Sequence, residues 1–189
     1  MKRLDMLGLA FIACLSLLHL TAAHGQGEDD IFAFIPSGGR TLLEAVREGG
    51  LPESLAANFA ETQADAAAWR ETLDAAMDEA PALGELDSWE TDTLAHYITW
   101  RAPFDPSEEL PRDGRDMALQ LCQSCHIITV VVTQEKTREA WLGTMNSPIH
   151  IEITTSEAER ELLGDYLVLK AGIPIVLVPP ALRAGGASY

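Results

Sequence analysis

The sequence predicts an all-α fold, and three of its features lead to that prediction. Apolar residues recur at intervals of three and four along most of the chain, as they do on the buried face of amphipathic helices. Glycine and proline separate these stretches into helix-sized pieces. The one internal run that favours a strand, residues 130–133, is too short and isolated to imply a sheet. With 47% hydrophobic residues, a chain of 189 residues can bury a core.

Residues 1–25 have the pattern of a secretory signal peptide. A basic start precedes a largely apolar run at residues 7–20, and small residues follow, with cleavage expected after Ala23 or Gly25. A retained membrane anchor is the competing interpretation, but the run is shorter than the roughly 20 residues that a bilayer core requires. Cys14 lies inside the run, which argues against a lipidated terminus. We therefore expect a periplasmic chain with no stable membrane insertion after cleavage.

The chain is strongly acidic, with 29 Asp and Glu against 13 Lys and Arg, a formal net charge of −16 and a pI near 4.5. Such a field repels nucleic acid and anionic membrane surfaces. It would attract a basic patch on a partner protein, and it would also keep an exported protein soluble. The charge excludes nucleic-acid binding and leaves both of these roles open.

The chain after residue 25 divides into two helical regions and three irregular segments. The first helical region is residues 39–104, with helices expected near residues 42–46, 55–59, 66–77 and 88–100. The irregular segments are an extended arm held by its aromatic residues, a Pro- and acid-rich linker, and an extended tail in which prolines forbid helix: residues 26–38, 105–113 and 173–189.

The second helical region is residues 114–172. A helix is expected from about Arg115, and another at residues 137–146. The last helix begins at Ser156, where Glu159 completes a capping box, and it ends near Gly172.

The chemistry of the chain is concentrated in the run Cys122-Gln123-Ser124-Cys125-His126. Two cysteines separated by two residues and followed at once by histidine form the attachment signature of haem c. Cys122 and Cys125 lie about one helical turn apart, so both thiols can add across the porphyrin vinyl groups, and His126 is then aimed at the iron from the same side. We therefore expect one covalent haem c, held by Cys122 and Cys125, with His126 as the proximal iron ligand.

Three other uses of this cysteine pair have less support in the sequence. A redox Cys-x-x-Cys would be expected beside a β-α-β pattern, and the sequence shows none. A disulfide across a two-residue spacer closes a strained loop with little entropic benefit. A zinc site would want a second pair of ligands, and only Cys122 and Cys125 remain once the signal peptide is removed.

From Gly114 to Tyr166 the chain resembles a small class I-type cytochrome c domain, and the likeness extends over roughly residues 114–172. Gly-Arg precedes a helix, the Cys-x-x-Cys-His follows, and then come a Thr-Arg-Glu-x-Trp helix, Ser-x-Ala-Glu, and Asp-Tyr-Leu in a terminal helix. The resemblance implies a small cytochrome c-like helical domain in which Trp141 and Tyr166 pack around the haem. It also implies that the helix containing Tyr166 crosses the helix that precedes Cys122.

The first helical region repeats features of the second. Counterparts follow 75, 72, 69 and 71 residues later for four features, Gly39-Arg40, Trp69, Tyr97 and Pro103, in Gly114-Arg115, Trp141, Tyr166 and Pro174. The place of the haem motif is taken by residues 47–50, Arg-Glu-Gly-Gly, which carry no Cys or His. The first region is then either a degenerate cytochrome-like unit that cannot carry haem or a set of generic amphipathic helices.

The family pattern is broken at the second axial ligand of the iron. Cytochromes of this kind commonly take a methionine about two turns beyond the tryptophan, where this chain has Pro148. Met145 lies one turn after Trp141 on the same helical face, and His150 lies in the loop just past Pro148. The sequence favours Met145 as the distal ligand, with His150 as the alternative. A thioether would raise the reduction potential and an imidazole would give a lower one.

Three further residues could contact the haem, although each could also have a plain surface role. His96 would reach the iron only if the two helical regions packed closely. Arg115 and Arg138 are candidates for pairing with the haem propionates, because a guanidinium can hold a carboxylate bidentately.

Together these features predict an extracytoplasmic monohaem carrier of single electrons, either soluble or as the cytochrome subunit of a periplasmic dehydrogenase, whose partners are redox proteins. The alternative is a haem enzyme or a binding protein for peroxide or nitric oxide, with an open sixth coordination site. The sequence has no nucleophile elbow, phosphate loop or supported pair of catalytic carboxylates. Electron transfer is therefore expected rather than catalysis by this chain alone.

Overall fold

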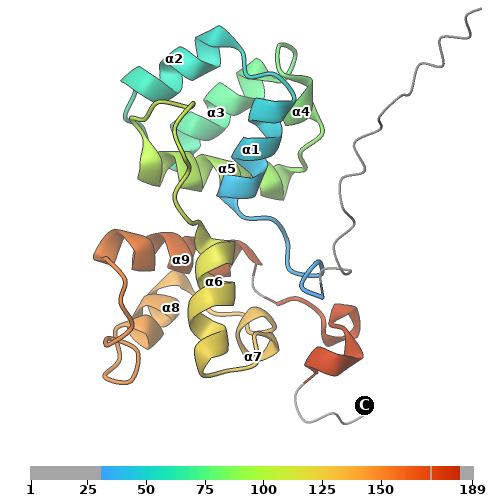
Figure 1. The fold of residues 1–189 in the computed structure, drawn as a ribbon, viewed down its shortest axis with the longest axis vertical. Coiled ribbons are helices and arrows are strands. Elements are labelled where there is room, and N and C mark those ends of the chain that lie inside the picture. The colour runs from blue at the N-terminus through green and yellow to red at the C-terminus, as the bar shows by residue number, and fades with distance from the viewer. Residues whose placement is uncertain (1–30, 171, 184–189) are drawn as a thin grey trace, which may run out of the picture. The chain divides into compact units, whose positions relative to one another are not determined.

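A computed structural model describes residues 31–170 and 172–183, and all of the regular structure in these ranges is helical (Figure 1). The all-α prediction is confirmed. The predicted signal peptide, residues 1–25, lies outside the described residues. Within the described ranges, no helix has the length and apolar character needed to cross a membrane.

The first helical region contains four predicted helices and one that was not predicted. They are α1 (Gly39–Glu48), α2 (Glu53–Glu61), α3 (Ala66–Ala76), the short α4 (Pro81–Gly84) and α5 (Ser88–Arg101). The long helix α5 packs against both α1 and α3, and α4 contacts the same two helices. The buried residues of α5 come from more than one face of the helix, because it is also packed against the second region.

The second helical region is likewise a series of short helices that ends in a long one. It contains α6 (Gly114–Leu121), the 3₁₀ turn η1 (Cys122–Ser124), α7 (Thr129–Val132), α8 (Arg138–Met145) and α9 (Glu157–Lys170), followed by the 3₁₀ turns η2 (Ile175–Leu177) and η3 (Pro180–Leu182). The terminal helix α9 packs against α6, the contact that the cytochrome resemblance implied, and also against α8 and α5 (Figure 1).

The preference of residues 130–133 for a strand is overridden in the structure. Residues Thr129–Val132 form the single-turn helix α7. Val131 and Val132 are buried, and the Thr129 hydroxyl donates to the carbonyl of Leu182 at 2.5 Å. Burial against the rest of the chain outweighs the β-propensity of these branched residues, which is a weak preference by comparison.

The arm and the linker are more ordered than their composition indicates. Residues 31–35 form a turn rather than an extended arm, in which the Ile35 amide donates to the Phe32 carbonyl at 2.8 Å. Ile35 is its buried anchor, while Phe32 is only half-buried. In the linker, the carbonyl of Glu108 accepts a hydrogen bond from Arg47 at 3.2 Å, and Leu110 is buried. The described residues from Ile31 onward cluster into one compact unit, so the two helical regions are not separate domains.

Two pairs of helices, α3 with α8 and α5 with α9, begin with matching caps. The Asp65 side chain accepts the amide of Ala68 at the start of α3, and the Thr137 side chain accepts the amide of Ala140 at the start of α8. A capping box opens α5 and another opens α9, and the two boxes are 69 residues apart, Asp87 with Glu90 and Ser156 with Glu159. The repeat seen in the sequence therefore extends to how the helices are started.

A reciprocal contact joins the two regions at equivalent positions. A Cβ added to Gly39 would lie 2.2 Å from the Cβ of Tyr97, and one added to Gly114 would lie 2.2 Å from the Cβ of Tyr166. The Tyr97 hydroxyl donates to the carbonyl of Pro111 at 2.7 Å, and the Tyr166 hydroxyl donates to the carbonyl of Pro36 at 2.8 Å. Each tyrosine thus crosses a helix of its own region and bonds the chain that leads into the other one. These matched contacts favour the repeat over a set of generic helices.

Asp113 ties the two pseudo-equivalent helix starts together. One of its oxygens accepts the Asp116 amide at 2.9 Å within α6, and the other accepts the Arg40 amide at 2.8 Å within α1. Gly38 leaves the room for this carboxylate, since a Cβ there would lie 2.1 Å from its Oδ2. One side chain therefore caps two helices.

Candidate haem site

The haem motif lies at the C-terminal end of α6, as predicted. Cys122 follows the last residue of the helix, and the chain continues as the 3₁₀ turn Cys122–Ser124. The amides of Cys125 and His126 both donate to the carbonyl of Cys122, at 3.3 and 2.9 Å. This turn keeps the two cysteines and the histidine together on one short stretch of backbone, held in place by α6.

These three side chains border a cavity of about 290 Å³. Its wall is mostly apolar and comes from every helix of the second region. Trp141 lies in α8, Leu163 and Leu167 lie in α9, and the loop between these helices contributes His150. The volume is at the lower limit of the range of about 300–1,000 Å³ that is usual for cofactor and ligand pockets.

The chemistry of the wall fits a covalent haem. Cys122 and Cys125 are free thiols at its edge, and burial raises the pKa of the Cys122 thiol to about 11. An apolar porphyrin face requires apolar walls, and its metal requires a donor, which His126 would supply. The indole Nε1 of Trp141 is buried without a hydrogen-bond partner among the described atoms, as is that of Trp69 in the first region.

A second imidazole faces the first across this cavity. The ring centres of His126 and His150 are 6.2 Å apart, with an angle of 36° between the ring planes. His150 is half-buried, and its Nδ1 lies 2.9 Å from the hydroxyl of Ser147. Met145 also borders the cavity, but its methyl group lies 3.4 Å from the position of a Cβ at Gly164, so it packs in the contact between α8 and α9.

Several residues with a predicted role at the haem do not reach the cavity. Tyr166 is directed to Pro36 instead, because its side chain crosses Gly114 at the α6–α9 contact. His96 and Arg138 both pair with Asp165, at 3.6 and 2.5 Å, which holds the pKa of that carboxyl below its usual value despite burial.

Arg115 likewise donates elsewhere, to the backbone carbonyls of Ile35 and Phe32 at 3.1 and 3.2 Å. Neither arginine of the sequence prediction is among the residues that border the cavity.

Two cations at the cavity were missed by the sequence analysis. Lys136 has its ammonium 4.5 Å from the centre of the Trp141 ring. Arg160, in the first turn of α9, bonds the Thr155 hydroxyl at 3.0 Å and the Ile151 carbonyl at 3.3 Å. Both are suited to pair with carboxylates at the cavity mouth. No spacing rule singles them out, since only the fold brings them to this wall.

The matching space in the first region is filled by its own side chains. Phe59 stacks on Phe104 with ring centres 5.4 Å apart and packs at 5.7 Å against Trp69. Leu83 of α4 is fully buried, and a Cβ added to Gly49 would lie 2.6 Å from the Cβ of Ala82. Helix α4 therefore closes directly on the end of α1, at the place where the second region has its cavity.

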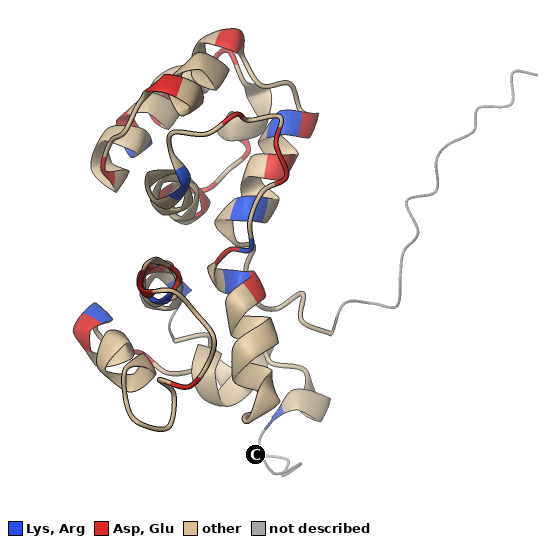
Figure 2. Ribbon diagram, turned by 60° about the vertical axis from the view of Figure 1, so that its left-hand side comes forward, with Lys and Arg blue, Asp and Glu red and all other residues tan. Residues whose placement is uncertain are grey.

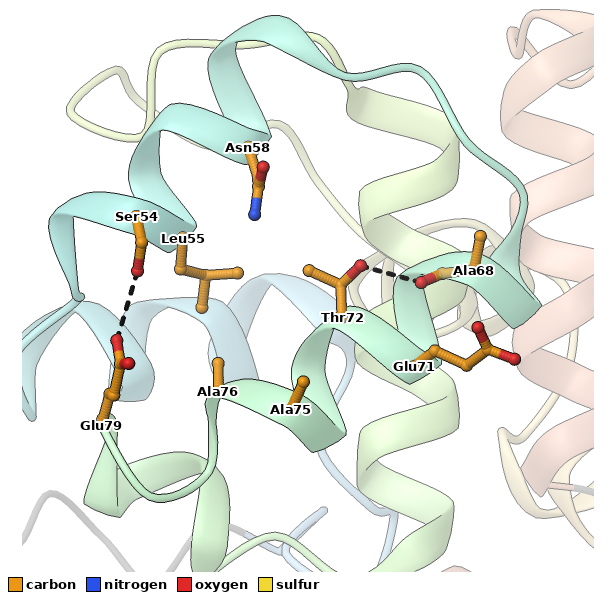
Figure 3. A pocket seen from close by; sticks show the side chains of 9 residues that line it. All are labelled: Ser54, Leu55, Asn58, Ala68, Glu71, Thr72, Ala75, Ala76 and Glu79. Atoms are coloured by element: carbon orange, nitrogen blue, oxygen red, sulfur yellow. Dashed lines mark hydrogen bonds between the residues drawn. The ribbon is translucent and has the colours of Figure 1, made fainter.

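A surface groove of about 530 Å³ lies between α2 and α3 in the first region (Figure 3). Its polar groups largely satisfy one another. The Ser54 hydroxyl donates to Glu79 at 3.3 Å, and the Thr72 hydroxyl donates to the carbonyl of Ala68 at 2.9 Å (Figure 3). The groove presents no histidine or cysteine and offers no haem site.

Neither a metal-binding cluster nor a similar known protein identifies the site independently. Among the residues that the structure describes, no three His, Cys, Asp or Glu side chains gather closely enough to hold a metal ion by themselves. No family model, no curated protein sequence and no solved structure matches this chain.

Proposed function

We propose that this chain is an extracytoplasmic monohaem c-type cytochrome that transfers single electrons. In this proposal Cys122 and Cys125 hold the haem through thioether bonds and His126 is the proximal iron ligand. The observation that carries the proposal is that these three residues border one apolar cavity, at the end of a helix whose start is doubly anchored through Asp113.

The residues of the cavity have separate tasks in this function. When bound, haem iron supplies a one-electron couple between its ferric and ferrous states. Trp141, Leu163 and Leu167 exclude water, and a low local dielectric reduces the reorganisation that accompanies a change of charge. Lys136 and Arg160 offset the charge of the haem carboxylates.

The rim of the cavity suits transient docking of a redox partner. Residues 117–134 and 141–151 contain no Asp, Glu, Lys or Arg, and the stretch from the second turn of α6 through α7 is uncharged in Figure 2. Ile127, Val130, Ile149 and Ile151 are exposed there, Ile149 to 85%. Exposed apolar residues gathered beside a site are typical of protein contact surfaces. A redox protein, such as a periplasmic dehydrogenase, is the partner class that this rim and the export signal support.

The proposal is tested by producing the full chain in a host that matures c-type cytochromes. We expect a coloured protein with haem-dependent peroxidase staining that survives denaturing electrophoresis, and a reversible one-electron reduction. The Cys122→Ser, Cys125→Ser double variant is the matched control and should lose the stain completely. A colourless wild-type protein would contradict the proposal. A wild type whose ferrous form binds carbon monoxide readily would favour the alternative, a haem enzyme or small-ligand sensor with an open iron.

A further inference from the structure

The spacing of His126 and His150 fits one iron between them. An imidazole nitrogen binds a first-row metal at about 2 Å, so two imidazoles on opposite sides of one metal ion place their ring centres roughly 6 Å apart. The observed separation is 6.2 Å, and both rings border the same cavity. The two side chains are therefore already at the distance that a shared axial axis requires.

The loop that carries His150 fixes which ring nitrogen is available. The Ser147 carbonyl accepts the amides of His150 and Ile151, both at 2.9 Å, so the backbone forms a tight turn around Pro148. The Ser147 hydroxyl lies 2.9 Å from Nδ1 of His150. With Nδ1 engaged in this way, Nε2 is the nitrogen left for a metal, and a hydrogen bond at Nδ1 is the usual support of a metal-binding histidine.

Met145 is accounted for without a role on the iron. Its methyl group packs toward Gly164 in α9, and the side chain is among the half-buried residues that contact the core. It lies on α8, whose position is set by the cap at Thr137 and by the contact with α9. The flexible thioether here fills space between two helices, which is a common use of methionine.

We infer that His150 is the second axial ligand of the haem iron and that Ser147 is its positioning residue. The inference rests on the proposed function. It makes the site a six-coordinate, bis-imidazole haem, closed to small ligands and lower in reduction potential than a His–Met site on the same fold. The electron donor must then have a lower potential than one that would serve a His–Met site, and the competing use of the site in peroxide or nitric oxide chemistry is disfavoured.

The test compares the haem spectra of matched variants of the full holoprotein. The wild type should be low-spin, lack the long-wavelength charge-transfer band of a thioether–iron bond, and fail to bind carbon monoxide when reduced. His150→Ala should become high-spin and bind carbon monoxide, and added imidazole should restore the low-spin spectrum. Met145→Leu, which removes the other donor at the cavity, should leave the spectrum and the potential unchanged.

The role of Ser147 is tested by carbon monoxide binding and by the reduction potential, which a residue with only a structural role would not change. Ser147→Ala should remain low-spin, but the hold of His150 on the iron should weaken by about 10–100-fold, the usual effect of losing such a support. The ferrous form should then begin to bind carbon monoxide, which the wild type does not do, and the reduction potential should increase. Ser147→Thr, which keeps the hydroxyl, should restore both properties.

Each other outcome contradicts the inference in its own way. If the wild type shows a thioether band and Met145→Leu abolishes it, the second axial ligand is Met145. If both His150→Ala and Met145→Leu remain low-spin, the second axial ligand is a third residue. A wild type that is high-spin and binds carbon monoxide would show a five-coordinate iron. All three leave covalent haem in place, whereas failure of the proposed function itself appears as the absence of haem staining.

Discussion

In residues 39–101 the space between α1, α3 and α5 is filled by Phe59, Trp69 and Leu83, whereas the space between α6, α8 and α9 is a cavity of about 290 Å³. Helices α3 and α8 begin with matching caps, and the two helix pairs cross at matching glycines. Such a frame therefore does not require a cofactor. The two frames differ in the segment that closes them, since helix α4 packs directly onto the end of α1, whereas the loop of His150 lies across an open cavity from the haem motif.

The two regions also differ in charge. Residues 39–110 carry sixteen Asp and Glu against four Lys and Arg, and residues 111–183 carry nine against seven (Figure 2). The acidity of the chain thus belongs mainly to the region without a haem motif. In the proposed function the first region supplies the field that attracts a basic partner, and the second supplies the uncharged rim where an electron passes.

The largest loss of stability is expected from removing an aromatic ring from the core of the first region. Phe59→Ala removes the ring that packs against both Phe104 and Trp69, and should lower the free energy of unfolding by about 3–5 kcal/mol. The haem spectrum should not change, because Phe59 does not border the cavity. Chemical denaturation followed by fluorescence and by haem absorbance measures both. The exposed Glu61→Ala on the same helix is the control, and a spectral change in Phe59→Ala would show that the two cores are coupled.

Adding one methyl group at each helix crossing tests whether the regions are structural repeats. Gly39→Ala and Gly114→Ala each place a Cβ at 2.2 Å from a tyrosine Cβ, so each should force its helix pair apart. We expect a loss of about 1–3 kcal/mol for either variant, measured as a shift in the denaturation midpoint. A variant tolerated at one position and not at the other would mean that the two crossings are not equivalent.

Removing the reciprocal tyrosine hydroxyls tests the contact between the regions. Tyr97→Phe and Tyr166→Phe each delete one hydrogen bond to a proline carbonyl, and each should cost about 0.5–1.5 kcal/mol. Thermal unfolding of the single and double variants gives the values. If either variant leaves the midpoint unchanged, its hydrogen bond does not contribute to joining the two regions.

The same tyrosines predict a loss of stability at high pH. Burial raises the pKa of Tyr97 and of Tyr166 well above the ordinary value, which is about 10 in an unfolded chain. Above that pH the unfolded state binds fewer protons than the folded one, so the free energy of unfolding falls as pH rises, by about 1 kcal/mol per tyrosine at pH ~10.5.

Urea titrations between neutral pH and about pH 10.5 check this slope. Comparison with the double Phe variant isolates the tyrosines from Lys170, whose pKa burial lowers to about 8 and whose effect has the opposite sign. An equal slope in the double variant would contradict the assignment.

Local patterns predicted most of the helices because caps and periodicity act over a few residues. The box of Ser156 and Glu159 and the stop near Gly172 are examples. Helix α7 was not predicted, since its valines are helical only through contacts with the distant tail. The turn at Ile35 was missed for the same reason, because its anchor is the core of the folded chain.

The cysteines and the histidine of the candidate site were identified from five consecutive residues, whereas the residues around them were not. Lys136, Arg160 and the pairing of Ser147 with His150 depend on where α8 and α9 place separate parts of the chain. Tyr166 was predicted to pack on the haem, but the repeat held a better signal. Pro36 and Pro111 are 75 residues apart, like the glycines, and they accept the two tyrosine hydroxyls in exchange.

The proposed function requires one haem bonded to the second region and none bonded to the first. Trypsin can release residues 116–136, which contain Cys122 and Cys125, by cleavage after Arg115 and Lys136. Mass spectrometry of the protein from a cytochrome-maturing host should find this peptide heavier by one haem and all peptides of residues 39–101 unmodified. A peptide 116–136 with the mass of bare polypeptide would contradict the account.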